Sequence, residues 1–200
     1  MRSEAWAKCI IGIAGSLLLF CESTQANDFE AHYGSLAELG VRDHTGQTGK
    51  SFTSAIGPYL YFQSGVRKGV WRPNLGVAFE FISGNATIAS GAVSGSVFTG
   101  GIYPGIDIYP LKTETLQPFV EFHALAAWNY ASLSPVIPKS AETSLSLGFG
   151  FQAGAGIDYK MHDGHRAFRL HACYLSSTAN IAGQPGFQLN AYAASLGLAF

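Results

Sequence analysis

The feature of this sequence that most constrains its fold is a strict two-residue alternation over residues 143–160. Every second position carries an apolar side chain or a tyrosine, in the order Leu145, Leu147, Phe149, Phe151, Ala153, Ala155, Ile157 and Tyr159. The positions between them hold only Ser, Gly and Gln until Asp158 and Lys160. A period of two is that of a β-strand, whose successive side chains point to opposite faces. The segment exceeds the usual strand of about 5–6 residues and reaches the roughly 9–11 residues that cross a bilayer at a tilt.

Further strands are predicted by the same alternation elsewhere in the chain. The regular ones are residues 71–81, 97–109, 116–130, 166–174 and 192–200, and two less regular ones are 28–41 and 52–63. Both faces of 52–63 are apolar, so the sequence leaves its register open. Long loops (42–51, 83–96, 131–142, 175–187) alternate with short turns (64–70, 110–115, 161–165). This pattern predicts an all-β fold, an eight-stranded antiparallel up-and-down transmembrane β-barrel with both termini at the short-turn end.

A soluble barrel or sandwich is the alternative, and the scarcity of charge excludes it. Charged residues make up 12% of the chain, whereas about 25% is usual. A soluble sheet needs a wetted, charged face, and neither face of 143–160 supplies one before Asp158. In lipid, only helices and closed barrels pair all their backbone groups. We therefore expect the bulky side chains to face lipid and the small polar ones to face the lumen.

The N-terminal residues are predicted to be a targeting segment for export and not to belong to the folded domain. Arg2 and Lys8 precede a short apolar run, and small residues follow up to Ala26. This is the pattern of a signal peptide, residues 1–26, which leaves residues 27–200 as one barrel domain. Lipoprotein processing at Cys21 is disfavoured because bulky Phe20 precedes it. Cys173 is then the only cysteine, which excludes an internal disulfide and gives no cysteine metal site.

The chain resembles the small eight-stranded outer-membrane barrels of the OmpA-, OmpX- and OmpW-like superfamily. The resemblance rests on the signal peptide, on the segment "LQPFVEFHALAAW" and on the tail "YAASLGLAF". It implies a location in the cell outer membrane, among its lipids and lipopolysaccharide. It also implies insertion by the barrel-assembly machinery, through a C-terminal strand that ends in Phe200. We expect a monomer, and the near-neutral charge predicts no nucleic-acid partner.

Charged residues at lumen-facing positions suggest how the interior is filled. They are Glu80, Asp107, Glu121, His123, Asp158, Lys160, Arg169 and His171, and the first strand adds Glu30, His32 and Glu38. Glu121 and His123 share one strand face and could reach one metal ion, but the sequence identifies no third ligand. We therefore predict no catalytic, cofactor-binding or metal-binding residue.

Three functions are open at this point. The favoured one is a structural or surface-interaction role, with a side-chain-filled lumen and with exposed loops such as 83–96. A narrow pore or small-ligand barrel is the second. A lipid A-modifying hydrolase is the least favoured, because the His-x-Ser pattern of that family reads Cys173-Tyr-Leu175 here. His171 and Ser176 cannot replace it, since five residues apart on a strand they point to opposite faces.

We expect the protein in the outer-membrane fraction, with an electrophoretic mobility that changes on boiling, because a closed barrel resists detergent until it is heated. The measurement is gel migration of boiled and unboiled samples from separated membrane and periplasmic fractions. A detergent-free periplasmic protein with one mobility would contradict the barrel.

Overall fold

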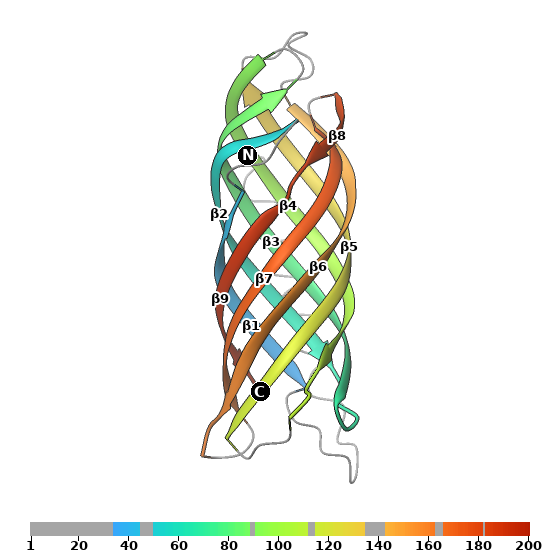
Figure 1. Cartoon of the computed structure of the whole chain (residues 1–200). Helices are drawn as coiled ribbons and strands as arrows, with labels where there is room; N and C mark the ends of the chain where they lie inside the picture. Colours follow the sequence, from blue (N-terminus) through green and yellow to red (C-terminus); the bar gives the residue numbers. More distant parts are fainter. Residues whose placement is uncertain are drawn as a thin grey trace, which may run out of the picture.

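A computed structural model describes residues 34–44, 50–88, 91–111, 115–134, 143–162, 166–181 and 183–200 (Figure 1). Its strands are β1 (Ser35–Asp43), β2 (Ser51–Gly65), β3 (Trp71–Ile88), β4 (Gly91–Ile108), β5 (Leu116–Ser134), β6 (Thr143–Lys160), β7 (Ala167–Ile181), β8 (Gln184–Gln188) and β9 (Ala191–Ala199). The expected signal peptide, residues 1–26, lies outside the described residues. Within the described part of the chain, no helix is long and apolar enough to cross a membrane.

The strands form a closed antiparallel barrel, as the alternation predicted. Each strand from β1 to β7 pairs with the next, and β9 pairs with both β7 and β1. β8 and β9 both lie along β7 and form one strand interrupted at Leu189 and Asn190, so the barrel has eight strands. Ser35 and Phe200 exchange backbone hydrogen bonds of 2.9 and 3.0 Å. The barrel therefore closes at the end where its last strand finishes, and the first described residues lie there too.

Several strands are longer than the sequence predicted. The expected loop 83–96 is wrong, because β3 continues to Ile88 and β4 begins at Gly91. Similarly, β5 extends to Ser134 and β7 to Ile181, where loops 131–142 and 175–187 were expected. The Ser, Gly and Ala content of these segments is typical of loops, but the two-residue alternation continues through them.

The polarity of the two faces of the sheet reverses along the barrel axis: apolar side chains face outward in one part and inward in the other. Register places Phe81 opposite Phe98, Phe98 opposite Tyr130, and Tyr130 opposite Leu145, so these residues form one row across β3–β6. On the Phe200 side of this row, large apolar residues face outward. On the other side, outward positions carry exposed uncharged polar residues: Thr53, Ser83, Asn85, Thr87, Ser94, Ser132 and Ser134.

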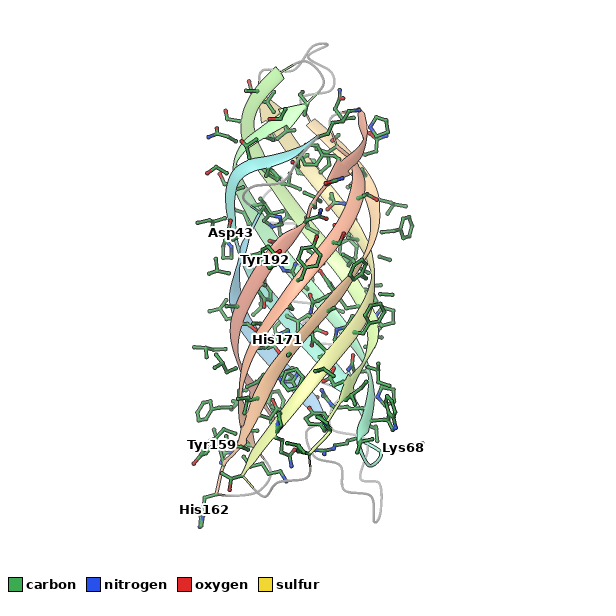
Figure 2. All side chains as sticks on the ribbon, in the orientation of Figure 1. Asp43, Lys68, Tyr159, His162, His171 and Tyr192 are labelled. Atoms are coloured by element: carbon green, nitrogen blue, oxygen red, sulfur yellow. The ribbon has the colours of Figure 1, made fainter. Side chains whose placement is uncertain are left out.

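We call the part between this row and Phe200 the membrane section, and the part beyond the row the distal section. Figure 2 shows outward side chains along the whole membrane section, between the levels of Tyr192 and Tyr159. In the distal section the inward side chains are apolar instead, among them Phe52, Ile82, Val97, Leu133 and Phe187. A polar outside around an apolar inside is the arrangement of a protein in water. The distal section therefore extends beyond the hydrocarbon.

The structure also decides the register of β2, which the sequence left open. Tyr59 and Tyr61 are buried in the lumen, whereas Ile56 and Leu60 are exposed on the outer face. Pairing with β1 sets Gly40 opposite Tyr59, and a Cβ at Gly40 would come within 2.6 Å of the Tyr59 ring. The glycine thus makes room for the tyrosine on the lumenal side.

An arginine on the outer wall tests where the bilayer ends. Ala124 and Ser132 both face outward from β5 and are exposed, but Ala124 lies midway along the membrane section and Ser132 lies beyond the row. We expect Ala124→Arg to lower the free energy of unfolding in lipid by about 2–4 kcal/mol, and Ser132→Arg by only about 0–1 kcal/mol. Urea titration of both variants in vesicles measures the difference. Equal costs would contradict the assigned boundary.

Candidate functional site in the barrel lumen

The lumen of the membrane section is filled by buried polar and charged side chains. The inward positions predicted from the sequence are confirmed for Glu38, Glu80, Asp107, Glu121, His123, Asp158, Arg169 and His171, all of which are buried. Lys160 is only partly buried, at the end of β6. Glu30 and His32 lie outside the described residues. Each of the five described lumenal acids lies within 4 Å of an arginine or histidine nitrogen.

The layer closest to Phe200 is an arginine–aspartate network. Arg169 holds Asp158 through Nε at 2.7 Å and Nη2 at 2.9 Å. Arg72 donates to Asp107 at 3.0 Å, and Tyr109 donates its hydroxyl to Asp158 at 2.9 Å. Buried charges are tolerated only when they are paired in this way. The layer joins β3, β4, β6 and β7 across the lumen.

Arg67 covers this layer from the turn between β2 and β3. Its guanidinium carbon lies 4.1 Å from the centre of the Tyr109 ring, and its Nη1 donates to Gln117 Oε1 at 2.6 Å. The side chain is buried. Stacking on an aromatic face suits a guanidinium that cannot be fully hydrated. The turn thus contributes a side chain that helps to close the lumen at this end.

Two histidines and Glu121 form the central layer. His171 lies on β7 with its Nε2 3.0 Å from Glu121 Oε1, and its Nδ1 lies 3.2 Å from Glu38 Oε2. Gln152 donates to Glu121 Oε1 at 2.7 Å. His123 Nε2 lies 2.8 Å from Asn74 Oδ1. Each contact joins residues of different strands, so this layer also spans the interior.

The third layer centres on Arg42, which crosses the lumen from β1. Its Nη1 donates to Glu80 at 2.8 Å, and its Nη2 donates to Gln152 at 3.0 Å. The guanidinium also lies 4.4 Å from the centre of the Tyr59 ring. His44 adds a contact of 2.7 Å from Nε2 to Glu80 Oε1. This layer separates the polar lumen from the apolar core of the distal section.

Sequence reasoning missed Arg42, His44 and Arg72 as lumenal residues, whereas the predicted inward position of Gln152 is confirmed. Arg42 and His44 fell in the expected loop 42–51, although the phase of Glu38, continued in steps of two, would have placed both inward. Arg72 lies next to Trp71 at the start of β3, where the phase was also readable. The two-residue alternation thus indicated these inward positions. Arg42 and His44 were overlooked because the first strand was predicted to end at residue 41.

The distal section is sealed by apolar packing rather than by charge. Phe52 and Phe187 meet edge to face with ring centres 5.7 Å apart. Around them lie further buried apolar residues from the other strands: Ile82, Ala86, Ile88, Val93, Val97, Ala131, Leu133, Ala179, Ile181 and Leu189. This core closes the lumen at the end opposite to the arginine–aspartate network.

Nucleophilic chemistry finds no support in these contacts. Ser176 donates to Asn190 Oδ1 at 3.0 Å, on the face opposite to the buried His171, as its position five residues away predicted. Ser195 Oγ lies 3.4 Å from His171 Nδ1, but its hydroxyl donates to Glu38 at 2.7 Å. A nucleophile needs a base that takes its own proton. The Ser195 hydroxyl is directed to a carboxylate inside a filled interior.

Comparisons with known proteins agree with the fold. No family model matches the chain, and no curated protein matches it. The crystal structure of the outer membrane protein OprG from Pseudomonas aeruginosa is similar, with a TM-score of 0.55, 15% identity, and 86% of this chain and 97% of that chain covered. The crystal structure of Neisserial surface protein A (NspA) gives a TM-score of 0.50 and 14% identity, with 82% and 93% covered. The chain has the architecture of a small outer-membrane barrel.

We expect the lumenal ion pairs to act as one unit. Arg169→Met leaves Asp158 and Asp107 without a cation that they contact now, and breaking a buried pair costs about 3–5 kcal/mol. The double variant Arg169→Met with Asp158→Leu removes one unpaired charge and should cost less than the sum of the two single changes. Urea unfolding of all three variants measures this coupling. Strict additivity would show that the two side chains do not interact.

Proposed function

We propose that this outer-membrane barrel has a structural or surface-interaction role and carries no solute. The observation that carries the proposal is a lumen filled along its described length, first by paired charges and then by an apolar core. Eight strands enclose a space that side chains can fill completely. The outward-facing apolar residues of the membrane section would contact lipids and lipopolysaccharide. The polar outer surface of the distal section would bind partners.

The distal wall supports the surface role by its composition. Most of its exposed outward polar positions carry serine, threonine and asparagine, and Asp43 on β1 adds a charged side chain at the level of Ser83. Hydroxyl and amide groups both donate and accept hydrogen bonds. They are presented on paired strands rather than on a mobile loop, so binding to them would cost little ordering entropy.

We further propose that the barrel-assembly machinery inserts the chain through its last strand. Leu196, Leu198 and Phe200 form the outward face of that strand and are exposed. The strand pairs with β1 from Asp43 to Leu36. It is thus the strand that closes the barrel, and we propose that the closed barrel is a monomer.

The pore alternative predicts conductance, and the sealed lumen predicts none. We expect the wild-type barrel in planar bilayers to show no stepwise current. The double variant Arg42→Ala with Tyr103→Ala removes a cross-lumen bridge, because Arg42 also contacts the Tyr103 hydroxyl at 3.3 Å. It should leak more current than the wild type. Defined single-channel steps from the wild type would contradict the proposal and favour the pore.

The hydrolase alternative is separated by a different measurement. We expect the mass spectrum of lipid A to be the same in cells with and without the gene, because His171 and Ser176 lie on opposite faces of β7. Loss of an acyl chain that depends on the gene would establish an enzyme instead.

A further inference from the structure

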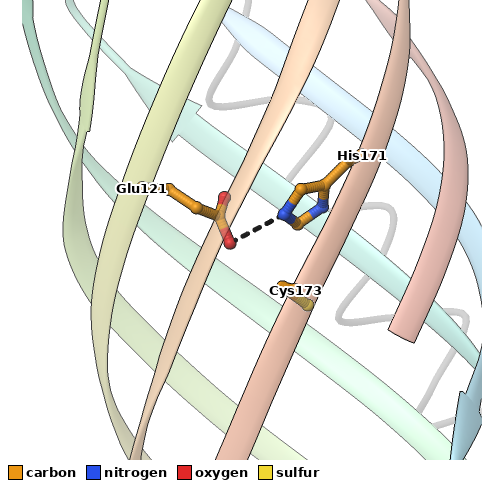
Figure 3. A group of neighbouring side chains, drawn as sticks. All are labelled: Glu121, His171 and Cys173. Atoms are coloured by element: carbon orange, nitrogen blue, oxygen red, sulfur yellow. Dashed lines mark ion pairs between the residues drawn. The ribbon is translucent and has the colours of Figure 1, made fainter. Parts of the chain in front are cut away.

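We propose that Glu121, His171 and Cys173 form a buried binding site for a divalent transition-metal ion of the zinc class. One ligand atom from each side chain can be chosen so that all lie within 4.8 Å of one another. His171 and Cys173 are two residues apart on β7 and therefore face the same way. Figure 3 shows Glu121 reaching toward His171 from β5, with Cys173 next to them on the strand of His171.

Glu121 and His171 already form a close buried ion pair, but one oxygen of the carboxylate is left over. His171 Nε2 lies 3.0 Å from Glu121 Oε1, and both side chains are buried. Glu121 Oε2 is also buried and without a hydrogen-bond partner. Unsatisfied buried polar atoms are costly and call for an explanation. A cation held between the imidazole nitrogen and the carboxylate would replace the ion pair and would also satisfy Glu121 Oε2.

Gly154 allows the proposed ligands to approach one another across β6. Strand pairing sets Glu121 opposite Gly154 and Gly154 opposite Cys173, so the glycine lies between the two ligands on β6. A Cβ at this position would come within 2.7 Å of His171 Nε2 and 2.6 Å of Cys173 Cβ. Any larger residue would collide with His171 and Cys173 and push these two ligands apart.

Glu38 and Ser195 orient the histidine for this role. Glu38 Oε2 lies 3.2 Å from His171 Nδ1, and the Ser195 hydroxyl donates to the same oxygen at 2.7 Å. A carboxylate that accepts the Nδ1 proton leaves the lone pair of Nε2 free for a metal. This carboxylate–histidine pairing commonly supports metal-ligating imidazoles.

Charge and donor type favour zinc over harder ions. A carboxylate, a thiolate and a neutral imidazole match the double charge of the ion, so the occupied site would be neutral within the barrel. Zinc accepts oxygen, nitrogen and sulfur donors together, and it tolerates three protein ligands with a fourth position open. Binding would release the thiol proton of Cys173. Cys173 needs no second cysteine for this, so the site differs from the cysteine clusters that the sequence excludes.

A second group of potential ligands is less suitable. Asp107, Glu121 and His123 also bring donor atoms within 4.8 Å of one another. Asp107, however, already accepts from Arg72 at 3.0 Å and from Asn74 at 2.7 Å, and Arg169 lies 3.4 Å away. Two guanidinium groups at one ligand would repel a cation.

Cobalt provides the direct test, because a thiolate bound to Co²⁺ gives a charge-transfer band in the near ultraviolet. The chain without the expected signal peptide, residues 27–200, is unfolded with chelator and reductant, refolded in detergent with Co²⁺, and then titrated with Zn²⁺. We expect the band in folded wild type, its loss as Zn²⁺ displaces Co²⁺, and one zinc per chain by elemental analysis. Cys173 is the only cysteine in residues 27–200, so the wild-type spectrum alone identifies the ligand. A folded barrel without the band would overturn the proposal.

Three variants and one control locate the site. Cys173→Ala should abolish the band, and Gly154→Ala should abolish it because the added Cβ displaces His171 and Cys173. Glu38→Gln should weaken zinc binding by about 10–100-fold, the usual effect of losing a carboxylate behind a ligand. His162→Asn alters an exposed histidine beyond the end of β6 and should change nothing. Equal metal uptake by wild type and the Cys173→Ala barrel, or loss of uptake in His162→Asn, would show adventitious surface binding and refute the site. Boiled and unboiled gel migration confirms folding of each variant.

Discussion

Pairing of β9 with β1 is the constraint on which the other features of this structure depend. In hydrocarbon, an open strand edge would leave a row of backbone groups without hydrogen bonds, at several kcal/mol each. Closure removes that edge, and it also creates an interior that lipid cannot enter. Arg42, Arg72 and Arg169 can then be buried at bilayer depth, because acids and amides from other strands surround them.

The apolar face of the sheet switches from outside to inside along the barrel axis because the outer surface contacts lipid in one section and water in the other. In the membrane section the solvent outside is apolar, so polar groups gather inside and must satisfy one another. In the distal section the outer wall carries hydroxyls and amides, and the interior becomes a hydrophobic core centred on Phe52 and Phe187. Filling of both sections, by different chemistry, is the basis of the proposed non-conducting role.

Much of the fold could be predicted because successive side chains of a membrane-barrel strand face the lipid and the lumen in turn, so each residue type indicates which side it faces. Leu145 to Tyr159 identified the outer face of β6, and Glu121 and His123 identified the inner face of β5. Predictions failed where composition and alternation disagreed. Residues 83–96 have the serine and glycine content of a loop, but Ile82, Ala86, Val93 and Val97 keep the period of two and pack inside the barrel.

The sequence by itself determined the strand count, the faces of most strands and the kind of residue that lines the lumen. It did so because side-chain orientation in a strand is a local property with a period of two. Which lumenal residues meet was decided only by the tertiary structure. Glu121 and Cys173 are far apart in the chain, and they share a row across Gly154 only because the strand registers align them. Register depends on the closure of the whole sheet, and no single strand contains that information.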